Sequence, residues 1–411
     1  MRLLFLETKR ILKSRQTMIL MAIGLILSIL MAYIPIRFEE IDRLTENGSV
    51  ESLSGIAAIQ YFKSKRSVYD GVVTTEKIHS ALEIYQFAIA QNNGDTVGVP
   101  FDTFAEKILP SRKLLSRLPE VYADPKTGIG TEIKDLQISN MGDYYDQCIQ
   151  HLDDIMKIEY TKNTNAQNKA KEMYHEVKKP FELYGGLSRD AFDYIILYVL
   201  LLLLIGAAIT APTFSEEYQN GSDSIFRSCR NGRLRMAGTK LIALYLIFIV
   251  YFILCMTINL LIINLAFGTE CLKTSVQMLF SAISLAPYNL GQLQIVVVAG
   301  ALLSLLATMA FSLFVSSKSR TSLPATLVSV VVCYLPSILY SANGGKWISY
   351  ILPSSGIGLK NSLLYQLVDF NFLNIGGISI WSPAIIIFVA IIEFLLFSFL
   401  AIRSYCKHEV V

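Results

Sequence analysis

Residues 194–214, YIILYVLLLLLIGAAITAPTF, decide the fold, because they form an uninterrupted apolar run without a charged side chain. An α-helix rises about 1.5 Å per residue, so a run of about 20 residues crosses a hydrocarbon core about 30 Å thick. Lipid offers no hydrogen-bond partner to a backbone group, which makes a helix the form that such a run must take. This stretch therefore predicts a transmembrane helix.

Five further runs have the same character, and the six together cover residues 17–36, 194–214, 241–263, 295–315, 323–340 and 383–402. The chain has 411 residues, 53 % hydrophobic and only 17 % charged, and its mean hydropathy is +0.46. The fifth run is the weakest, since Pro336 lies inside it. A cleaved signal peptide is the alternative for the first run, but its apolar stretch is long and no small-x-small site follows it. We predict an all-α membrane protein with six transmembrane helices.

Basic residues in the short loops predict the orientation. Fourteen Lys and Arg residues lie before the first run, between the second and third, between the fourth and fifth, and after the sixth, whereas the two short loops on the other side hold three. Loops rich in Lys and Arg stay in the cytoplasm. Both termini are therefore expected inside, in the cytoplasmic membrane.

The long stretch 37–193 is then an extracytoplasmic domain. Apolar residues recur at helical spacing in 144–160, and 75–91 and 165–184 also have helical patterns, so the domain is expected to be mainly helical. Of the six cysteines only Cys148 and Cys271 face outside, where they either pair or are small buried side chains. The chain is expected to begin with a cytoplasmic amphipathic helix, 1–16, followed by span 17–36, the outer domain 37–193 and span 194–214. A cytoplasmic loop, 215–240, then leads to spans three to six within 241–402, which enclose the outer loops 264–294 and 341–382. A cytoplasmic tail, 403–411, follows the last span.

Catalytic and nucleotide-binding signatures are missing from the sequence. It contains no G-x-x-x-x-G-K-[ST], H-E-x-x-H or G-x-S-x-G pattern. His151 with Asp153 and Asp154 is a candidate metal site, but a hydrated, charged helix face explains these residues better. The net charge of +3 gives no reason to expect nucleic acid. We therefore expect no enzyme activity, no cofactor and no metal, and a protein without its own energy source.

Polar residues inside the runs are few. Glu393 in the sixth run is a candidate functional residue, because an ionisable group in a bilayer is costly, although a neutral or hydrogen-bonded carboxyl would serve structure alone. Asn259 and Asn264 are expected to join helices.

The loop 214–240, FSEEYQNGSDSIFRSCRNGRLRMAGTK, is the most informative polar segment. Its apolar residues among arginines allow short amphipathic helices on the membrane surface, and a basic loop lying on lipid would explain the arginines without any further role. An acidic pair, a glycine, a Ser-Asp turn, an arginine and a final lysine follow one another along it: Glu216 and Glu217, Gly221, Ser222 and Asp223, Arg233, Lys240.

This arrangement resembles the permeases of type-2 ABC exporters, in the branch with a large extracytoplasmic domain after the first span. The resemblance implies that Glu216, Glu217, Gly221, Arg233 and Lys240 belong to a coupling helix that docks on a separate cytosolic ABC ATPase, which hydrolyses the ATP. It also implies an apolar segment, 348–359, that dips into the membrane from outside. Two permease chains, identical or related, would form the pathway among membrane lipids. The first, second and fifth spans would line it, with close packing at Gly206, Ala207 and Ala208.

The function implied by the resemblance is ATP-driven export of a peptide antibiotic, drug or lipid-like compound from a Gram-positive bacterium. Two alternatives stay open. One is a membrane-anchored sensor or assembly protein whose outer domain binds a ligand. The other is an ion-coupled secondary transporter, which would need intramembrane charges or broken helices in matched halves.

Overall fold

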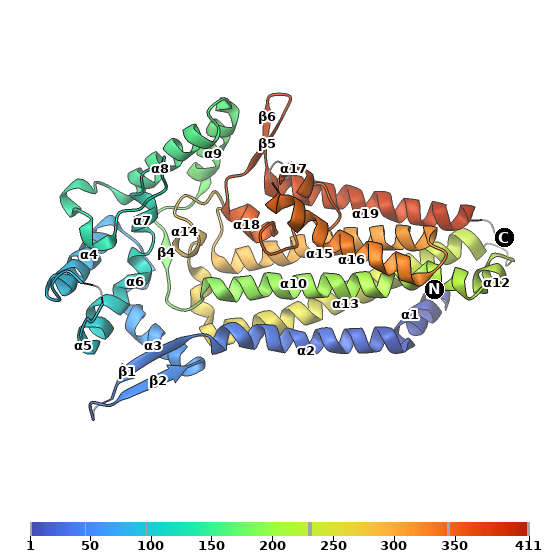
Figure 1. Cartoon of the computed structure of the whole chain (residues 1–411), viewed down its shortest axis with the longest axis horizontal. Coiled ribbons are helices and arrows are strands. Elements are labelled where there is room, and N and C mark those ends of the chain that lie inside the picture. The colour runs from blue at the N-terminus through green and yellow to red at the C-terminus, as the bar shows by residue number, and fades with distance from the viewer. Residues whose placement is uncertain (1, 46, 96, 229–231, 343–345, 409–411) are drawn as a thin grey trace.

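Six long helices lie side by side in a bundle, and most of the remaining chain forms a second body at one end of it (Figure 1). This computed structural model describes residues 2–45, 47–95, 97–228, 232–342 and 346–408. The membrane-crossing helices are α2 (Arg15–Arg37), α10 (Arg189–Thr210) continued by α11 (Pro212–Gln219), α13 (Gly232–Phe267), α15 (Leu290–Lys318), α16 (Ser322–Ser341) and α19 (Ser382–Lys407). Each contains one of the six predicted runs, which confirms an all-α membrane protein.

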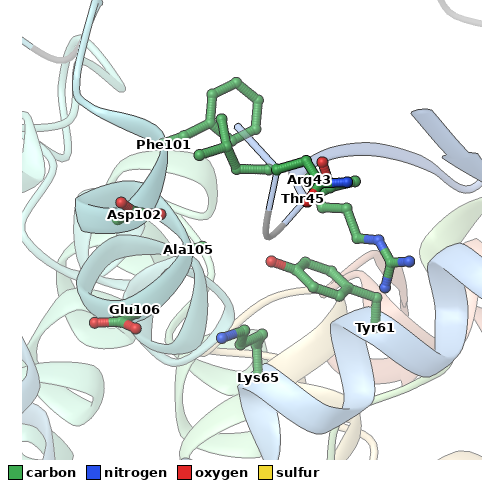
Figure 2. A pocket seen from close by; sticks show the side chains of 10 residues that line it. Arg43, Thr45, Tyr61, Lys65, Phe101, Asp102, Ala105 and Glu106 are labelled. Carbon is green, nitrogen blue, oxygen red and sulfur yellow. The ribbon is translucent and has the colours of Figure 1, made fainter. Parts of the chain in front are cut away.

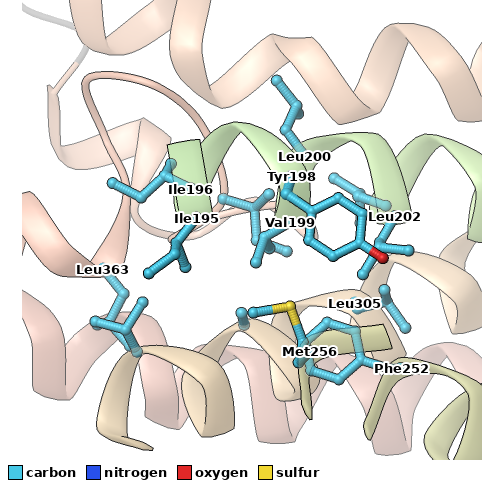
Figure 3. Close-up of a cluster of buried hydrophobic side chains, with 14 of the residues drawn as sticks. Ile195, Ile196, Tyr198, Val199, Leu200, Leu202, Phe252, Met256, Leu305 and Leu363 are labelled. Carbon is cyan, nitrogen blue, oxygen red and sulfur yellow. The ribbon is translucent and has the colours of Figure 1, made fainter. Parts of the chain in front are cut away.

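The helix α10 lies at the centre of the bundle. In its most apolar window 72 % of residues are buried, against 28 % for α2 and 22 % for α16. Figure 3 shows its side chains, Tyr198 among them, next to Phe252 and Met256 of α13. A side chain added at Gly206 would touch Phe248 and Met309 of the same chain. Within the chain, the close approach at Gly206 therefore joins α10 to α13 and α15.

Two amides join helices as predicted. Asn259 of α13 donates from Nδ2 to the carbonyl oxygen of Ser28 in α2 at 3.0 Å. Asn264 and Gln294 exchange two amide hydrogen bonds of 3.0 Å between α13 and α15. Amides paired across helices in this way stabilise a bundle in lipid by about 1 kcal/mol each.

The helix α16 runs without a break through Pro336. Proline has no N–H, so the carbonyl oxygen of Val332, four residues earlier, loses its helical donor. The hydroxyl of Ser354 replaces that donor at 2.7 Å. On the other side, Thr308 in α15 donates to the carbonyl oxygen of Pro353 at 2.9 Å. The segment predicted to dip into the membrane therefore reaches the middle of α16, between α15 and α16.

Residues 38–188 make up most of the second body. Its elements are β1 (Glu40–Leu44), β2 (Val50–Ser54), α3 (Ile56–Arg66), η1 (Ser67–Tyr69), β3 (Gly71–Val72), α4 (Thr75–Ala90), α5 (Phe101–Thr103), the π-helical turn η2 (Phe104–Ile108), α6 (Leu109–Leu115), α7 (Leu118–Val121), η3 (Ile133–Asp135), η4 (Ile138–Asn140), α8 (Tyr144–Glu159), α9 (Thr164–Glu176) and β4 (Glu182–Leu183). Side chains of Thr74, Asp143 and Asn163 cap α4, α8 and α9. The predicted helix 165–184 is wrong beyond Glu176, because Pro180 disfavours helix in the residues before it and β4 then pairs with β3.

The second body also contains parts of two later loops. In these loops, η5 (Thr269–Lys273), α17 (Lys346–Ser349) and α18 (Leu363–Val368) pack on the bundle. The helix α14 (Val276–Leu279) and the hairpin β5 (Phe372–Ile375)–β6 (Ile378–Trp381) contribute to the second body. Its hydrophobic core takes in Met278, Ala282, Ile283 and Phe372. Tyr174 donates its hydroxyl to the carbonyl oxygen of Ala282 at 2.8 Å. The body is therefore assembled from three separate stretches of chain and is attached to the bundle at several helix ends.

The two cysteines expected outside do not pair. Cys148 and Cys271 are both buried free thiols, and they belong to different hydrophobic clusters. The interpretation as small buried side chains is the one that the structure supports.

Candidate coupling site

The segment predicted to couple the chain to a partner lies at the end of the bundle that carries α1 (Arg2–Lys13) and the end of α19, opposite the second body (Figure 1). It consists of α11 and the short helix α12 (Ser222–Ser228). Pro212 interrupts the hydrogen-bond ladder of the second span there. The hydroxyl oxygen of Ser316 in α15 accepts from the backbone N–H groups of Phe214 (3.0 Å) and Ser215 (3.1 Å). The break is thus fixed by a neighbouring helix, and α11 is no free hinge.

Glu217 is the centre of an ionic cluster in which Glu7, Glu217 and Lys240 are buried and the Arg10 side chain is 47 % exposed. Its Oε1 lies 3.1 Å from Nη1 of Arg10 and forms a second ion pair with Lys240, whose side chain is fully buried at the start of α13. Arg10 also pairs with Glu7 on the next turn of α1 at 2.9 Å. These four residues, Glu7, Arg10, Glu217 and Lys240, are called the ionic cluster below. It joins α1, α11 and α13.

Aromatic rings hold the other side of α11. The ring of Phe214 lies 4.8 Å from that of Tyr405 in α19, and Tyr218 stacks on His408 at 4.1 Å. The Lys240 ammonium group lies 5.5 Å from the ring of Phe214, within cation–π range. Contacts with four other helices, α1, α13, α15 and α19, therefore fix α11.

The other predicted residues are on the surface. Glu216 and Arg233 are exposed. Gly221 follows the end of α11 with a φ of +68°, a left-handed conformation that glycine adopts without strain. The acidic pair is thus divided: Glu217 has partners within the chain, whereas Glu216 faces outward.

A cavity of about 560 Å³ opens beside Glu216. The elbow between α1 and α2 lines one side with Lys13, Ser14 and Gln16, and Thr213 and Asn220 line the other. Basic and acidic groups thus meet around an open space.

The part of α1 in the ionic cluster was not predicted from the sequence, where Arg10 counted only toward the topology. The one available signal was an acidic residue, Glu7, among the apolar residues of an amphipathic helix. In the structure Glu7 is only 5 % exposed.

Glu393 lies within α19 and is 8 % exposed. Within the described residues, its Oε2 has no hydrogen-bond partner. No other predicted site residue is near Glu393 in the sequence, and no residue of the ionic cluster lies on α19. Its function stays a prediction.

The candidate metal site of His151, Asp153 and Asp154 does not form. Asp153 forms ion pairs with Lys157 and Lys171, at 2.8 and 2.6 Å, and His151 is buried in α8. The part of the chain that the structure describes has no group of three or more His, Cys, Asp and Glu residues arranged to hold a metal ion.

A sequence model of the ABC-2 family of transporter proteins matches residues 1–403, from α1 through all six spans. The chain belongs to the ABC-2 transporter family. Members of this family are the membrane permeases of ABC transporters, which work with an ABC ATPase. No curated protein matches the sequence.

Proposed function

We propose that this ABC-2 permease exports an amphipathic compound, such as a peptide antibiotic, a drug or a lipid-like molecule, with energy from ATP hydrolysed by a separate cytosolic subunit. The proposal places both termini and α11 in the cytoplasm and residues 37–193 outside. The fourteen-to-three bias of Lys and Arg supports this orientation. It places the protein in the cytoplasmic membrane of a bacterium, and the resemblance favours a Gram-positive one.

The observation that carries the proposal is the fixation of α11. Ser316, the ionic cluster and Tyr405 hold it against four other helices, yet Glu216 and the neighbouring cavity stay open to a partner. A rigid element with an exposed acidic group can receive a force from an ATPase and pass it to the spans. Gly221, Arg233 and α12 extend the same contact surface.

A second permease chain completes the pathway in this proposal. Three spans have strongly exposed apolar faces: α2, with Ile19 and Ile26, α16, with Leu323 and Val331, and α19, with Phe388 and Leu395. These faces are offered to the second copy and to lipid. Because α10 is enclosed by its own chain, we place it behind the pathway wall and not at its surface.

The sensor alternative rests on a free-standing outer domain. The second body shares its core with the loop 264–294 and the hairpin β5–β6, so its movement and that of the spans are linked. This favours transport over simple anchoring.

Glu216→Gln in the permease reconstituted with its ATPase tests the proposal. We expect ATP hydrolysis to continue while export falls at least tenfold. Glu172→Gln on α9 is the matched control, since Glu172 is an exposed carboxylate at the opposite end. Export at the unaltered rate in Glu216→Gln would remove this residue from coupling. Labelling of a cysteine placed at Gly232, and not of one at Asn93, by an impermeant thiol reagent in intact cells would overturn the orientation.

A further inference from the structure

The second body contains a hollow of about 510 Å³ between the hairpin β1–β2, α3 and the segment α5–η2. Figure 2 shows Tyr61 and Lys65 on α3 on one side of it and Asp102 and Glu106 on the other, with Phe101 at one end. A volume of this size is typical of sites for small ligands, which span about 300–1,000 Å³. We call this space the outer hollow.

Charges of opposite sign line the outer hollow without neutralising each other. Asp102 and Glu106 are four residues apart and therefore share one helix face. Arg43 is paired with Glu51 across the hairpin at 2.8 Å. Within the described residues no ion pair joins Lys65 to Asp102 or Glu106, and the ammonium group of Lys65 lies 5.8 Å from the Tyr61 ring. The hollow thus offers a cationic and an acidic side to one ligand.

A smaller hollow of about 210 Å³ adjoins it. Ile41, Val99 and Phe104 line this mainly apolar space together with Asp42, and Phe101 borders both hollows. A ligand that spans the two needs an apolar group beside its charges.

We propose that the outer hollow binds a short zwitterionic peptide with an apolar side chain. The peptide carboxylate pairs with Lys65, its amino group pairs with Asp102 and Glu106, and its apolar side chain enters the space beside Phe101. Charge-assisted hydrogen bonds of this kind are about twice as strong as neutral ones. A bound peptide would also bridge α3 and η2, two elements that the empty hollow separates.

This inference goes beyond the proposed function, because it concerns binding at the second body and requires neither the ATPase nor export. The hairpin extends away from the end of α2, so the outer hollow lies beyond the bundle (Figure 1). A free peptide reaches such a place more readily than a lipid that stays in the bilayer does.

Calorimetric titration of the full-length protein in nanodiscs tests the proposal. The probe is the tetrapeptide Gly-Phe-Leu-Gly with free termini. Its acetylated and amidated form lacks the charges, and tetraglycine lacks the apolar side chains. We expect saturable binding of the first peptide and at least tenfold weaker binding of the other two. Lys65→Met and Phe101→Ala should each weaken the binding at least tenfold, whereas Lys126→Met, in an exposed turn far along the chain, should leave it unchanged.

Glu106→Gln provides a second variant on an exposed side chain in case Lys65→Met or Phe101→Ala lowers the thermal midpoint of the protein. Equal binding of the capped peptide, or binding that none of the three variants weakens, overturns the proposal. Failure of all three peptides to bind at millimolar concentration overturns it as well. Saturable binding of glycerophosphocholine in place of the peptides would assign the hollow to a lipid headgroup and refute the peptide.

Discussion

Ser354 donates its hydroxyl to the carbonyl oxygen of Val332 in the middle of α16, at 2.7 Å. That oxygen is available because Pro336 supplies no N–H to it. An irregular segment can enter the hydrocarbon region only where protein satisfies its polar groups and those it displaces. The proline in the fifth span and the serine in the following loop therefore form one structural device.

Ser354→Ala should leave the Val332 carbonyl oxygen without a partner and lower the free energy of unfolding by about 1–2 kcal/mol. In a Pro336→Ala background the alanine N–H can bond Val332 instead, and the same serine change should then cost less than about 0.5 kcal/mol. Reversible unfolding in a denaturing detergent, measured for the four members of this double-mutant cycle, gives the coupling. Additive effects of the two changes would show that the two residues do not share this oxygen.

Lys240→Met should destabilise the protein strongly, because it removes one of the two cationic partners of buried Glu217. Breaking a buried ion pair from one side costs about 3–5 kcal/mol. Adding Glu217→Gln to Lys240→Met should recover part of the loss, since the buried carboxylate that lost one of its two cationic partners is then replaced by a neutral amide. The control is Glu216→Gln, an exposed neighbour, which should stay within about 0.5 kcal/mol of the wild type in the same thermal unfolding measurement. An equal loss in the Glu216 variant would contradict the division of the acidic pair.

The sequence alone was enough to find the six spans, since each needs only about 20 apolar residues and the loops carry a strong bias of charge. The resemblance placed Glu216, Glu217 and Lys240 in one segment, but the structure pairs only Glu217 with Lys240 and leaves Glu216 exposed. The sequence could not show that Arg10 reaches Glu217, because 207 residues separate them and no local pattern encodes that contact. The contact is a property of how α1 packs against α13.

The second body was harder to predict for a related reason. Three separate stretches of chain share its core, so the hydrophobic pattern of 37–193 alone is incomplete. The boundary at Glu176 also depends on tertiary pairing, since β4 pairs with β3 more than a hundred residues earlier. The outer hollow escaped sequence analysis entirely, because its charges come from elements that are far apart along the chain and have no shared motif.

Lys113 should make the stability of the protein depend on pH. Its Nζ donates to the carbonyl oxygen of Leu187 at 2.8 Å and links α6 to the segment before α10. Desolvation by burial, with repulsion from Arg66 second, lowers the pKa of Lys113 to about 8. Because the folded pKa lies below the unfolded value, the folded state binds fewer protons between pH 8 and about 10.5. Stability should therefore rise with pH across this window.

At ~1.4 kcal/mol per pKa unit, the contribution of Lys113 to that rise is of the order of 3 kcal/mol. Lys113→Met should flatten it, whereas Lys126→Met, which replaces an exposed lysine, should not. The measurement is the free energy of unfolding at pH 8 and pH 10 for both variants and the wild type. Identical pH slopes in all three proteins would show that this ammonium group is not desolvated.

An isolated 37–193 fragment should fail to fold stably, because it lacks the side chains that later loops contribute to its core. Met278, Ala282 and Ile283 are each less than 5 % exposed in the whole protein. Tyr174 would lose its bond to the Ala282 carbonyl oxygen, and its buried hydroxyl would have no replacement. The fragment is expected to show helical far-ultraviolet circular dichroism with no cooperative thermal transition.

A fragment in which a short linker appends residues 274–286 should regain cooperativity. The control carries the same linker with a scrambled 274–286 segment. Cooperative melting of 37–193 by itself would show that the second body is an independent domain, which would return weight to the sensor alternative.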